Sequence, residues 1–414
     1  MTKTSKQRLV FLLGSGISIP AKMPKLYEIT EKVLSGQGIS YYTGIFPSHV
    51  PPFVDLAKKL KEEGQQENVW KVTKFLRRLK TEIEDYYKKH PFKLDTSYED
   101  LYYMASQIYY SELGQYDNPA VQPLIDKIFP EIKFLLKKTN TGYERTLSQL
   151  AEEAMKYIEY VVSFELTKEP QTLDYLDCVK DCIKEYCENK DFAKVDIFTL
   201  NHDSVLEKFL KQSRILFTDG FFKPRKEKHR YWKPSLFNNG FFKVRLFKLH
   251  GSINWFRLKP KDMKDLSHEL IGIPFVPEMD NLKIKDNRGR IIQVKEQLLL
   301  VGTYNKMLEY TSGIFRELHY RFYDSLSKVR QLVICGYGLE DHGINTQIID
   351  WLYSSQSDRR IILIDPHPET LKNKNSIISN KWDELIKANK LKVLQKGIEN
   401  VCWQDLKYLL RQNI

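Results

Sequence analysis

The sequence QRLVFLLGSGIS, residues 7–18, runs from a short apolar segment into a glycine-rich turn. The apolar part, Gln7–Leu13, predicts a buried strand that ends at Gly14. Two glycines, in the pattern G-x-G-x-S, permit a tight turn and a close backbone approach to a pyrophosphate at the next helix. The pattern is shorter than the full G-x-G-x-x-G motif, so taken alone it favours a structural turn over a binding loop.

Five more apolar segments, all after residue 191, predict further buried strands. They are VDIFTL (195–200), VRLFKLH (244–250), QLLLVGT (297–303), QLVICGYG (331–338) and RIILIDP (360–366). Helical patterns follow some of them, at 204–212, 311–329 and 342–353. Buried strands that alternate with helices indicate an α/β fold with a parallel sheet covered on both faces. We therefore expect a Rossmann-like, doubly wound sheet, which binds ligands at the carboxyl ends of its strands near the switch point.

The middle of the chain has a different pattern. Apolar residues recur at spacings of three and four in 147–162 and again in 69–87, which is typical of amphipathic helices. We interpret residues 46–190 as a large inserted helical subdomain, and residues 1–45 together with 191–414 as the Rossmann-like domain. Residues 218–243 and 257–296 look like ordered loops that leave the sheet.

Composition narrows the class of protein. The chain has 414 residues, of which 42% are hydrophobic and 29% charged, as is ordinary for a globular enzyme. No run approaches 18 apolar residues, so we expect no membrane span. The first apolar run is too short for a signal peptide, which favours a cytoplasmic protein. Five cysteines without a C-x-x-C pair argue against a zinc ribbon and against a disulfide framework.

Polar residues stand where the predicted strands end. TLNHD (199–203) follows the second strand, where Asn201 and Asp203 have the alternative role of capping the next helix. LHGS (249–252) places His250 at a strand end, where an imidazole can act as a general base near neutral pH. A lone histidine is more often structural, and we expect Gly251 to leave room for a ligand.

Two later segments follow the same rule. GYGLED (336–341) could hold a ribose or phosphate, and its alternative is an ordinary glycine-rich turn. Asp365, before Pro366, could accept hydrogen bonds from ribose hydroxyls, and its alternative is a turn-initiating Asp-Pro pair. Each signal is weak alone, but their joint occurrence at successive strand ends is much more specific.

With these motifs in this order, the chain resembles the sirtuin family, in particular its divergent bacterial branch associated with antiphage defence. Sirtuins carry a G-A-G-x-S loop, a T-Q-N-x-D segment, a catalytic H-G pair and a late glycine turn, which look like GSGIS (14–18), TLNHD (199–203), HG (250–251) and GYG (336–338) here. KLHGSINW (248–255), TYNK (303–306) and GYGLED (336–341) are similar to the divergent branch. Residues 46–190 match the family poorly.

Three departures from the sirtuin pattern matter. Ser15 replaces the usual alanine, and IPAKMP (19–24) stands where the family has I-P-D-F-R. Deacylase sirtuins carry a four-cysteine zinc module after the catalytic histidine, but no cysteine lies between His250 and Cys335. This departure favours NAD hydrolysis over protein deacylation, and we expect no metal.

The resemblance implies that the chain cleaves NAD to nicotinamide and ADP-ribose or a cyclic form. By resemblance His250 acts as general base, and Asn201 orients water and the ribose. The loop 14–18 holds the pyrophosphate, while 336–338 and Asp365 contact the adenosine half. The residues that we expect to bind NAD are Gly14, Ser15, Gly16, Ile17, Ser18, Asn201, Asp203, Gly336, Tyr337, Gly338, Asp341 and Asp365.

The resemblance also bears on partners. An enzyme that depletes NAD must be gated, so we expect a homo-oligomer, with a HerA-type ring ATPase as the partner. The net charge of +12 and the basic, aromatic segment 221–233 leave a nucleic-acid-binding or nuclease-like subunit as the leading alternative. No acidic cluster with metal-ligand spacing supports nuclease chemistry, and a solvated basic face is the simpler interpretation. A protein deacylase and a non-catalytic NAD or ADP-ribose sensor are further alternatives.

Overall fold

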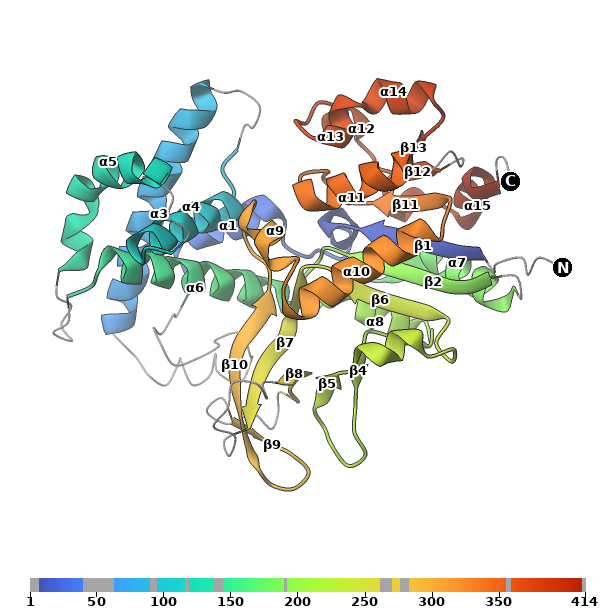
Figure 1. Ribbon diagram of the computed structural model, residues 1–414, viewed down its shortest axis with the longest axis horizontal. Helices are drawn as coiled ribbons and strands as arrows, with labels where there is room; N and C mark the ends of the chain where they lie inside the picture. Colours follow the sequence, from blue (N-terminus) through green and yellow to red (C-terminus); the bar gives the residue numbers. More distant parts are fainter. Residues whose placement is uncertain are drawn as a thin grey trace.

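Seven parallel strands form the sheet at the centre of the chain (Figure 1). The computed structural model describes residues 7–39, 63–89, 95–115, 119–137, 144–189, 192–260, 270–275, 283–354 and 359–411. The sheet has the order β13-β12-β11-β1-β2-β6-β3. Its strands are β1 (Gln7–Leu13), β2 (Phe192–Thr199), β3 (Phe217–Thr218), β6 (Val244–Lys248), β11 (Gln331–Cys335), β12 (Arg360–Ile364) and β13 (Leu391–Leu394). The predicted Rossmann-like, doubly wound fold is confirmed.

The switch point of this sheet lies between β1 and β11. From β1 the chain adds β2 and β6 on one side, and it adds β11, β12 and β13 on the other. Cys335, Leu13 and Thr199 are in register across β11, β1 and β2, and Thr199 pairs with Lys248 on β6. The loops that leave these four strands therefore start side by side, at the edge where doubly wound folds bind ligands.

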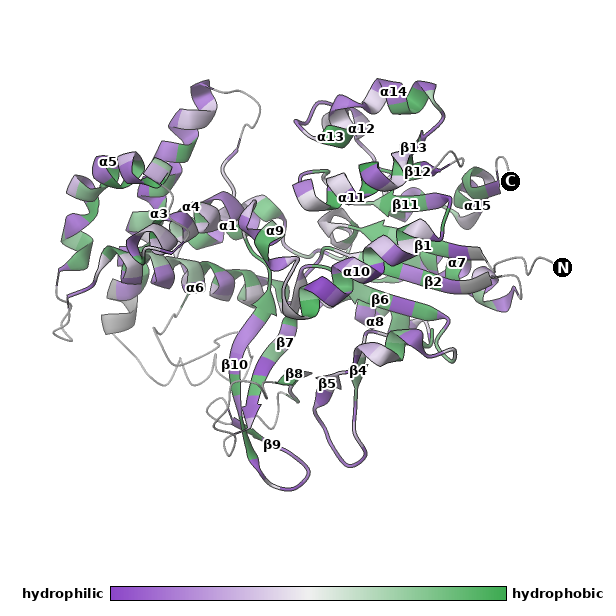
Figure 2. Cartoon of the chain, in the orientation of Figure 1, coloured by the Kyte–Doolittle hydropathy of each residue, from purple (hydrophilic) through white to green (hydrophobic). Residues whose placement is uncertain are grey.

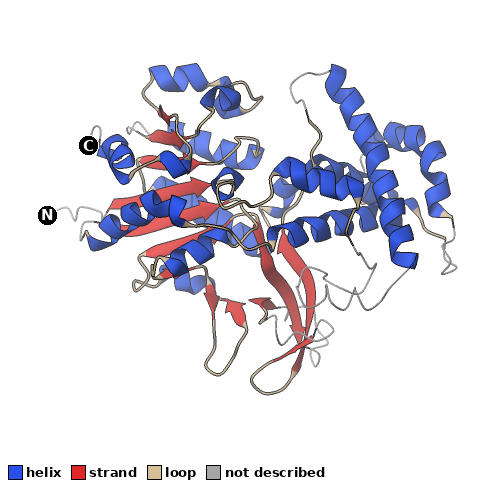
Figure 3. Ribbon diagram, turned by 180° about the vertical axis from the view of Figure 1, so that it is seen from behind, coloured by secondary structure: helices blue, strands red, loops and turns tan. Residues whose placement is uncertain are grey.

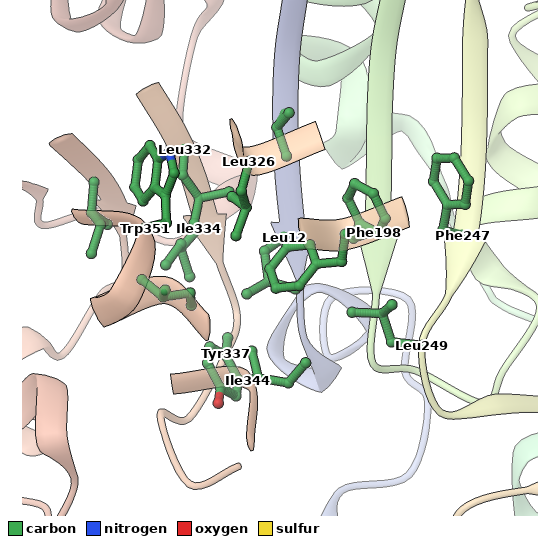
Figure 4. Packing of buried hydrophobic residues seen from close by; sticks show 14 of the residues in the cluster. Leu12, Phe198, Phe247, Leu249, Leu326, Leu332, Ile334, Tyr337, Ile344 and Trp351 are labelled. Carbon is green, nitrogen blue, oxygen red and sulfur yellow. The ribbon is translucent and has the colours of Figure 1, made fainter. Parts of the chain in front are cut away.

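Helices cover both faces because alternate residues of each strand point to opposite sides. Leu12 faces one core with Phe198 and Phe247, whose rings stack with centroids 4.5 Å apart (Figure 4). The helices α10 (Gly313–Ser327) and α11 (His342–Tyr353) complete this core. On the other face pack α7 (Asp177–Glu188), α8 (Val205–Gln212) and α15 (Trp403–Arg411). The helices predicted at 204–212, 311–329 and 342–353 are confirmed.

Five helices share a separate hydrophobic core beside the sheet (Figures 1 and 3). They are α1 (Leu26–Ser35), α3 (Glu63–Lys89), α4 (Tyr98–Glu112), α5 (Gln122–Ile132) and α6 (Leu147–Leu166). Hydrophilic and hydrophobic residues form alternating bands along them, as amphipathic helices require (Figure 2). Capping boxes begin two of the helices, with Ser97 before α4 and Thr146 before α6.

The inserted subdomain, residues 46–190, stays a proposal, and part of it (46–62 and four shorter segments) lies outside the described residues. The packing of α1 and α7 indicates where this subdomain begins and ends. The helix α1 precedes residue 46 but packs in the helical core, whereas α7 precedes residue 190 but packs against the sheet. We propose that the helical unit runs from α1 to α6.

A second sheet was not expected from the sequence. Six strands pair antiparallel in the order β4-β5-β8-β7-β10-β9. They are β4 (Phe221–Phe222), β5 (Arg230–Trp232), β7 (Gly251–Pro260), β8 (Leu270–Ile273), β9 (Lys283–Lys285) and β10 (Ile291–Leu299). The segments 218–243 and 257–296, interpreted as loops, thus contribute strands.

The prediction that 297–303 forms a strand of the parallel sheet is wrong, because β10 ends at Leu299 and pairs antiparallel with β7. The apolar character of residues 297–303 does not come from a place in the parallel sheet. Leu298 and Leu300 belong to the core under the parallel sheet, whereas Leu299 and Val301 belong to the helical core. Burial on both sides produces the continuous apolar pattern of a central parallel strand.

The remaining elements are short. They are the helices α9 (Asn305–Glu309), α12 (Pro368–Lys372), α13 (Ile377–Asn380) and α14 (Trp382–Lys387), and the 3-10 turns Ser15–Ser18, Pro119–Val121, Lys133–Leu136, Asp174–Leu176, Pro234–Asn238 and Ile398–Asn400. Among the described residues, no helix combines the length and the apolar character that crossing a membrane requires.

Candidate functional site

Two glycine-rich loops pack backbone to backbone at the switch point. The amide of Gly14 donates to the carbonyl of Cys335 (2.9 Å), and that of Gly16 donates to Gly336 (2.8 Å). A Cβ on Gly14 would lie 2.4 Å from the Gly336 oxygen, and one on Gly16 would lie 2.7 Å from the Gly336 Cα. The glycines therefore permit this close approach of β1 to β11. These hydrogen bonds engage the amides of Gly14 and Gly16. Within residues 14–18, Ser15 is the exposed residue.

Three polar side chains join the first loop to the one after β2. Ser18 Oγ donates to Asp203 Oδ2 (2.9 Å), and Asn201 Nδ2 donates to Ser18 Oγ (3.0 Å). Asp203 Oδ1 also accepts from the amide of Val205, the first residue of α8 (2.9 Å), although the N-cap position of that helix is Ser204. Asn201 Oδ1 is buried without a partner. Such an atom is costly to leave unpaired, and an oriented ligand hydroxyl or water would satisfy it.

A buried lysine, not found from the sequence, holds this loop in place. Lys248, at the end of β6, is 1% exposed. Its Nζ donates to the carbonyls of His202 (3.3 Å) and Asp203 and forms an ion pair with Glu207 Oε1 (3.0 Å). A charge at this depth is tolerated because it is paired and hydrogen-bonded. The sequence signal was a lysine at the end of a strand that also contains Arg245.

His250 lies between β6 and β7 and is held by two residues from other elements. Its Nε2 is 2.9 Å from Asp341 Oδ2 and 3.0 Å from the Tyr310 hydroxyl, which in turn donates to Asp341 Oδ2 (2.5 Å). Asp341 Oδ1 accepts from the amide of Ile344 (2.9 Å) and so caps α11. A single carboxylate thus anchors both the helix and the imidazole.

The charge of Asp341 defines the tautomer of His250. Burial would raise the pKa of Asp341, but the hydrogen bond from His250, the charge of Lys306 and the hydrogen bond from Tyr310 lower it well below its usual range. Burial and Asp341 raise the pKa of Tyr310, which keeps its proton. A carboxylate only accepts hydrogen bonds, so His250 Nε2 carries the proton and Nδ1 is left as a base.

Two further histidines flank this group. The rings of His202 and His250 are 6.2 Å apart, and His319 on α10 stacks on Tyr310 at 3.7 Å. Burial lowers the pKa of His319 to about 3 and also lowers that of His202 well below its usual value. Both are neutral at pH 7, with His202 Nδ1 and His319 Nε2 buried without partners. Neither Tyr310 nor His319 gave a sequence signal.

Other predicted residues serve the loops themselves. Tyr337 is buried and donates to Asn345 Oδ1 (2.9 Å), and Gly338 follows it in the same turn. Asp365 accepts from the amide of His367 (2.7 Å), which is the turn-initiating alternative. A Cβ on Gly251, whose φ is +81°, would lie 2.1 Å from the Leu298 oxygen. Gly251 therefore makes room for β10, and the expectation that it makes room for a ligand is wrong.

An ion pair joins the helical unit to the site. Lys306, from the TYNK segment, is buried, and its Nζ lies 2.7 Å from Glu99 Oε1 on α4. Its charge lowers the pKa of Asp341 and of His202, after the larger effects of burial and of His250. Among the described residues, no group of three His, Cys, Asp or Glu is placed to hold a metal ion.

The comparison with family models agrees with the motifs. Residues 195–392 match the family model of the SIR2-like domain. Among solved structures, the chain is similar to a Sir2 homologue in complex with NAD, at 9% identity over 98% of this chain and 90% of the other, with a TM-score of 0.35. It is also similar to SIR2 bound to an inhibitor, 2′-O-acetyl-ADP-ribose and a deacetylated peptide, at 8% identity over 99% and 96%, with a TM-score of 0.35. No curated protein matches the chain.

Proposed function

We propose that this chain, of which residues 195–392 match the SIR2-like domain, is an NAD⁺ glycohydrolase. It cleaves the nicotinamide–ribose bond of NAD⁺ and releases nicotinamide and ADP-ribose or a cyclic form. One observation carries the proposal: Ser18, Asn201 and Asp203 form a network at the switch point, beside an imidazole held by Asp341. Doubly wound folds bind dinucleotides at this edge.

The groups present suit NAD⁺ as a substrate. The exposed Ser15 in the loop 14–18 is available to the pyrophosphate, whereas the neighbouring glycine amides are used by the loop after β11. The unpartnered Asn201 Oδ1 would accept from a ribose hydroxyl or from the attacking water. We place the adenosine half beside 336–338 and Asp365, and we assign Asp341 to holding His250.

Cleavage of the nicotinamide–ribose bond needs a general base and no general acid. Nicotinamide leaves as a neutral molecule, since the bonding pair neutralises its pyridinium nitrogen. The electron-deficient ribose carbon then bonds to the oxygen of a water molecule or of a ribose hydroxyl, which loses its proton to His250 Nδ1. Asp341 and Tyr310 stabilise the resulting imidazolium through Nε2–H. A positioned general base contributes about 10²–10⁴-fold in rate.

Hydrolysis is favoured over protein deacylation by the segment after His250. No cysteine lies between His250 and Cys335, so the four-cysteine zinc module of deacylase sirtuins is missing. The described residues there form the antiparallel strands β7–β10. We further propose that the protein is a cytoplasmic antiphage effector that depletes NAD⁺ in abortive infection, gated by homo-oligomerisation and a HerA-type ATPase.

The test is NAD⁺ cleavage by the purified full chain, with products resolved by chromatography. His250→Ala is expected to lose about 10²-fold or more of the turnover while keeping the parent's fold by circular dichroism. The exposed His367, changed to Ala, is the matched control and should keep full activity. Unchanged NAD⁺ loss in His250→Ala would refute the proposed role. Turnover only with an acyl-lysine peptide would favour a deacylase, and binding without turnover would favour a sensor.

A further inference from the structure

The positive charge of the chain is concentrated in the part that builds the second sheet. Residues 218–299 hold eighteen Lys and Arg against nine Asp and Glu, so they carry +9 of the net +12; Lys243, Arg245 and Lys248, at β6 of the parallel sheet, account for +3 of this. They make up about a fifth of the chain. Both hairpins of this sheet, β4–β5 and β9–β10, point away from the parallel sheet (Figure 1) and have hydrophilic loops (Figure 2).

The loops of these two hairpins meet, although about 60 residues separate them. His229 Nε2 lies 3.0 Å from the carbonyl oxygen of Lys285. The amide of Asn287 donates to Glu227 Oε1 at 3.1 Å. Residues 222–233 and 283–290, together with Phe275, therefore form one surface, which we call the double-hairpin surface.

On the described part of the double-hairpin surface, the acidic side chains Glu227 and Asp286 are buried, whereas basic side chains are exposed. Glu227 is buried and accepts from the Tyr231 hydroxyl (3.2 Å) as well as from Asn287. Asp286 is buried too, and it accepts from two backbone amides and from Arg290 Nε (2.7 Å). The acids thus serve the loops internally. Six exposed bases have no acidic partner among the described residues: Lys223, Arg225, Lys226, Lys283, Lys285 and Arg288.

Two phenyl rings are exposed among these cations. Phe222 is 43% exposed and Phe275 is 41% exposed. Lys233 Nζ lies 5.1 Å from the centre of the Phe222 ring, and Lys228 Nζ lies 5.4 Å from that of Phe275. The amide of Phe275 donates to His229 Nδ1 (2.9 Å), which ties this ring to the hairpin loops.

We propose that the double-hairpin surface binds single-stranded DNA. Its unpaired cations face the phosphates, and its exposed rings stack on bases, which is the combination that single-strand-binding proteins use. In a duplex the bases stack on one another, so the exposed rings would have no free base to stack on. Because Glu227 and Asp286 are engaged in hydrogen bonds within the loops, the described part of the surface presents cations and rings to the strand. This inference does not depend on NAD⁺ cleavage.

The charge test measures binding of a labelled single strand of about 20 nucleotides to the full chain by fluorescence anisotropy. The variant Arg225→Glu, Lys226→Glu, Arg288→Glu is expected to bind about tenfold or more weakly at 0.1 M salt, with a salt slope smaller by about 2. The control Lys133→Glu, Lys211→Glu, Lys387→Glu makes the same charge change on exposed lysines of other elements. Equal losses in the two variants would overturn the proposal.

The stacking test separates single strands from other polyanions. Phe222→Ala with Phe275→Ala should weaken single-stranded DNA binding about tenfold and leave heparin binding unchanged. Phe241, which is 69% exposed and lies outside the surface, is the control for a lost ring. Tighter binding of RNA, of duplex DNA of the same length, or of phosphatidylserine vesicles would overturn the proposal, as would no binding at all.

Discussion

Asp341 joins the candidate chemistry to the fold. One of its oxygens caps α11 and the other accepts from His250 and Tyr310, so the orientation of the imidazole is set by the start of a helix. A carboxylate beside a histidine holds one tautomer and stabilises the imidazolium that forms when the base takes a proton. Asp341 is therefore a positioning residue, and its effect on His250 can be tested apart from its effect on folding.

Asp341→Asn keeps the oxygen that caps α11. It replaces the oxygen that accepts the hydrogen bond from His250 Nε2 with an amide group, which donates. We expect the Nδ1–H tautomer to replace the Nε2–H tautomer and turnover to fall about 10²–10⁴-fold, with little change in unfolding temperature. Nitrogen-15 NMR of the labelled imidazole reports the tautomer directly. Asp350, exposed near the end of α11, supplies the Asp→Asn control. An unchanged tautomer with normal turnover would remove Asp341 from this role.

His319 predicts a pH dependence of stability. Its folded pKa is about 3, because of burial, and an unfolded histidine has a pKa of 6.5. Between these values the unfolded state binds one more proton, so the free energy of unfolding falls as the pH falls below about 6.5. The slope from this group is at most about 1.4 kcal/mol per pH unit. His202 acts in the same direction.

His319→Phe should make the loss of stability between pH 6 and pH 4 shallower by up to about that slope. Absolute stability falls as well, since the contact with Gln347 Nε2 (3.2 Å) is lost, so the readout is the slope of urea-derived free energies against pH. His367→Phe, at a position that stays in water, controls for a lost imidazole. An identical slope in His319→Phe and the parent would show that His319 is not buried neutral.

At the scale of elements, the close approach of β1 to β11 positions every loop of the site. Gly336 has a φ of +64°, and a Cβ there would lie 2.4 Å from the amide nitrogen of Ile17. Gly336→Ala should lower the free energy of unfolding by about 3 kcal/mol, from overpacking and from the left-handed backbone. Gly240→Ala, where a Cβ would meet nothing within 4 Å, should change it by less than about 0.5 kcal/mol. Urea unfolding compares the two, and equal stabilities would contradict the packing.

For the whole molecule, we expect a homo-oligomer, since an enzyme that depletes NAD⁺ needs a control beyond substrate binding. Multi-angle scattering should give a mass that is a multiple of the 49.0 kDa chain. A monomer under all conditions would count against the proposal. The ion pair between Lys306 and Glu99 joins the helical unit to a lysine whose charge lowers the pKa of Asp341.

Local patterns in the sequence were enough to find the parallel strands and the polar residues at their ends. Five apolar residues before Gly14 and the apolar runs before Asn201 and Gly336 are local signals, readable without knowing what packs against them. Because parallel strands end at one edge, order along the chain sufficed to predict that these loops meet. The hydrogen bonds of Ser18 with Asn201 and Asp203 agree with that reasoning.

What surrounds His250 depended on packing between distant elements. Tyr310 and Asp341 are 60 and 91 residues away in sequence, and nothing near either residue signals an imidazole partner. The same holds for Lys248, whose burial is visible only once α8 brings Glu207 against it. Four of the six strands in the second sheet, β4, β5, β8 and β9, have four residues or fewer, which is too short to show an alternating pattern in the sequence. Side-chain partners across a fold follow from three-dimensional packing, which a one-dimensional pattern does not encode.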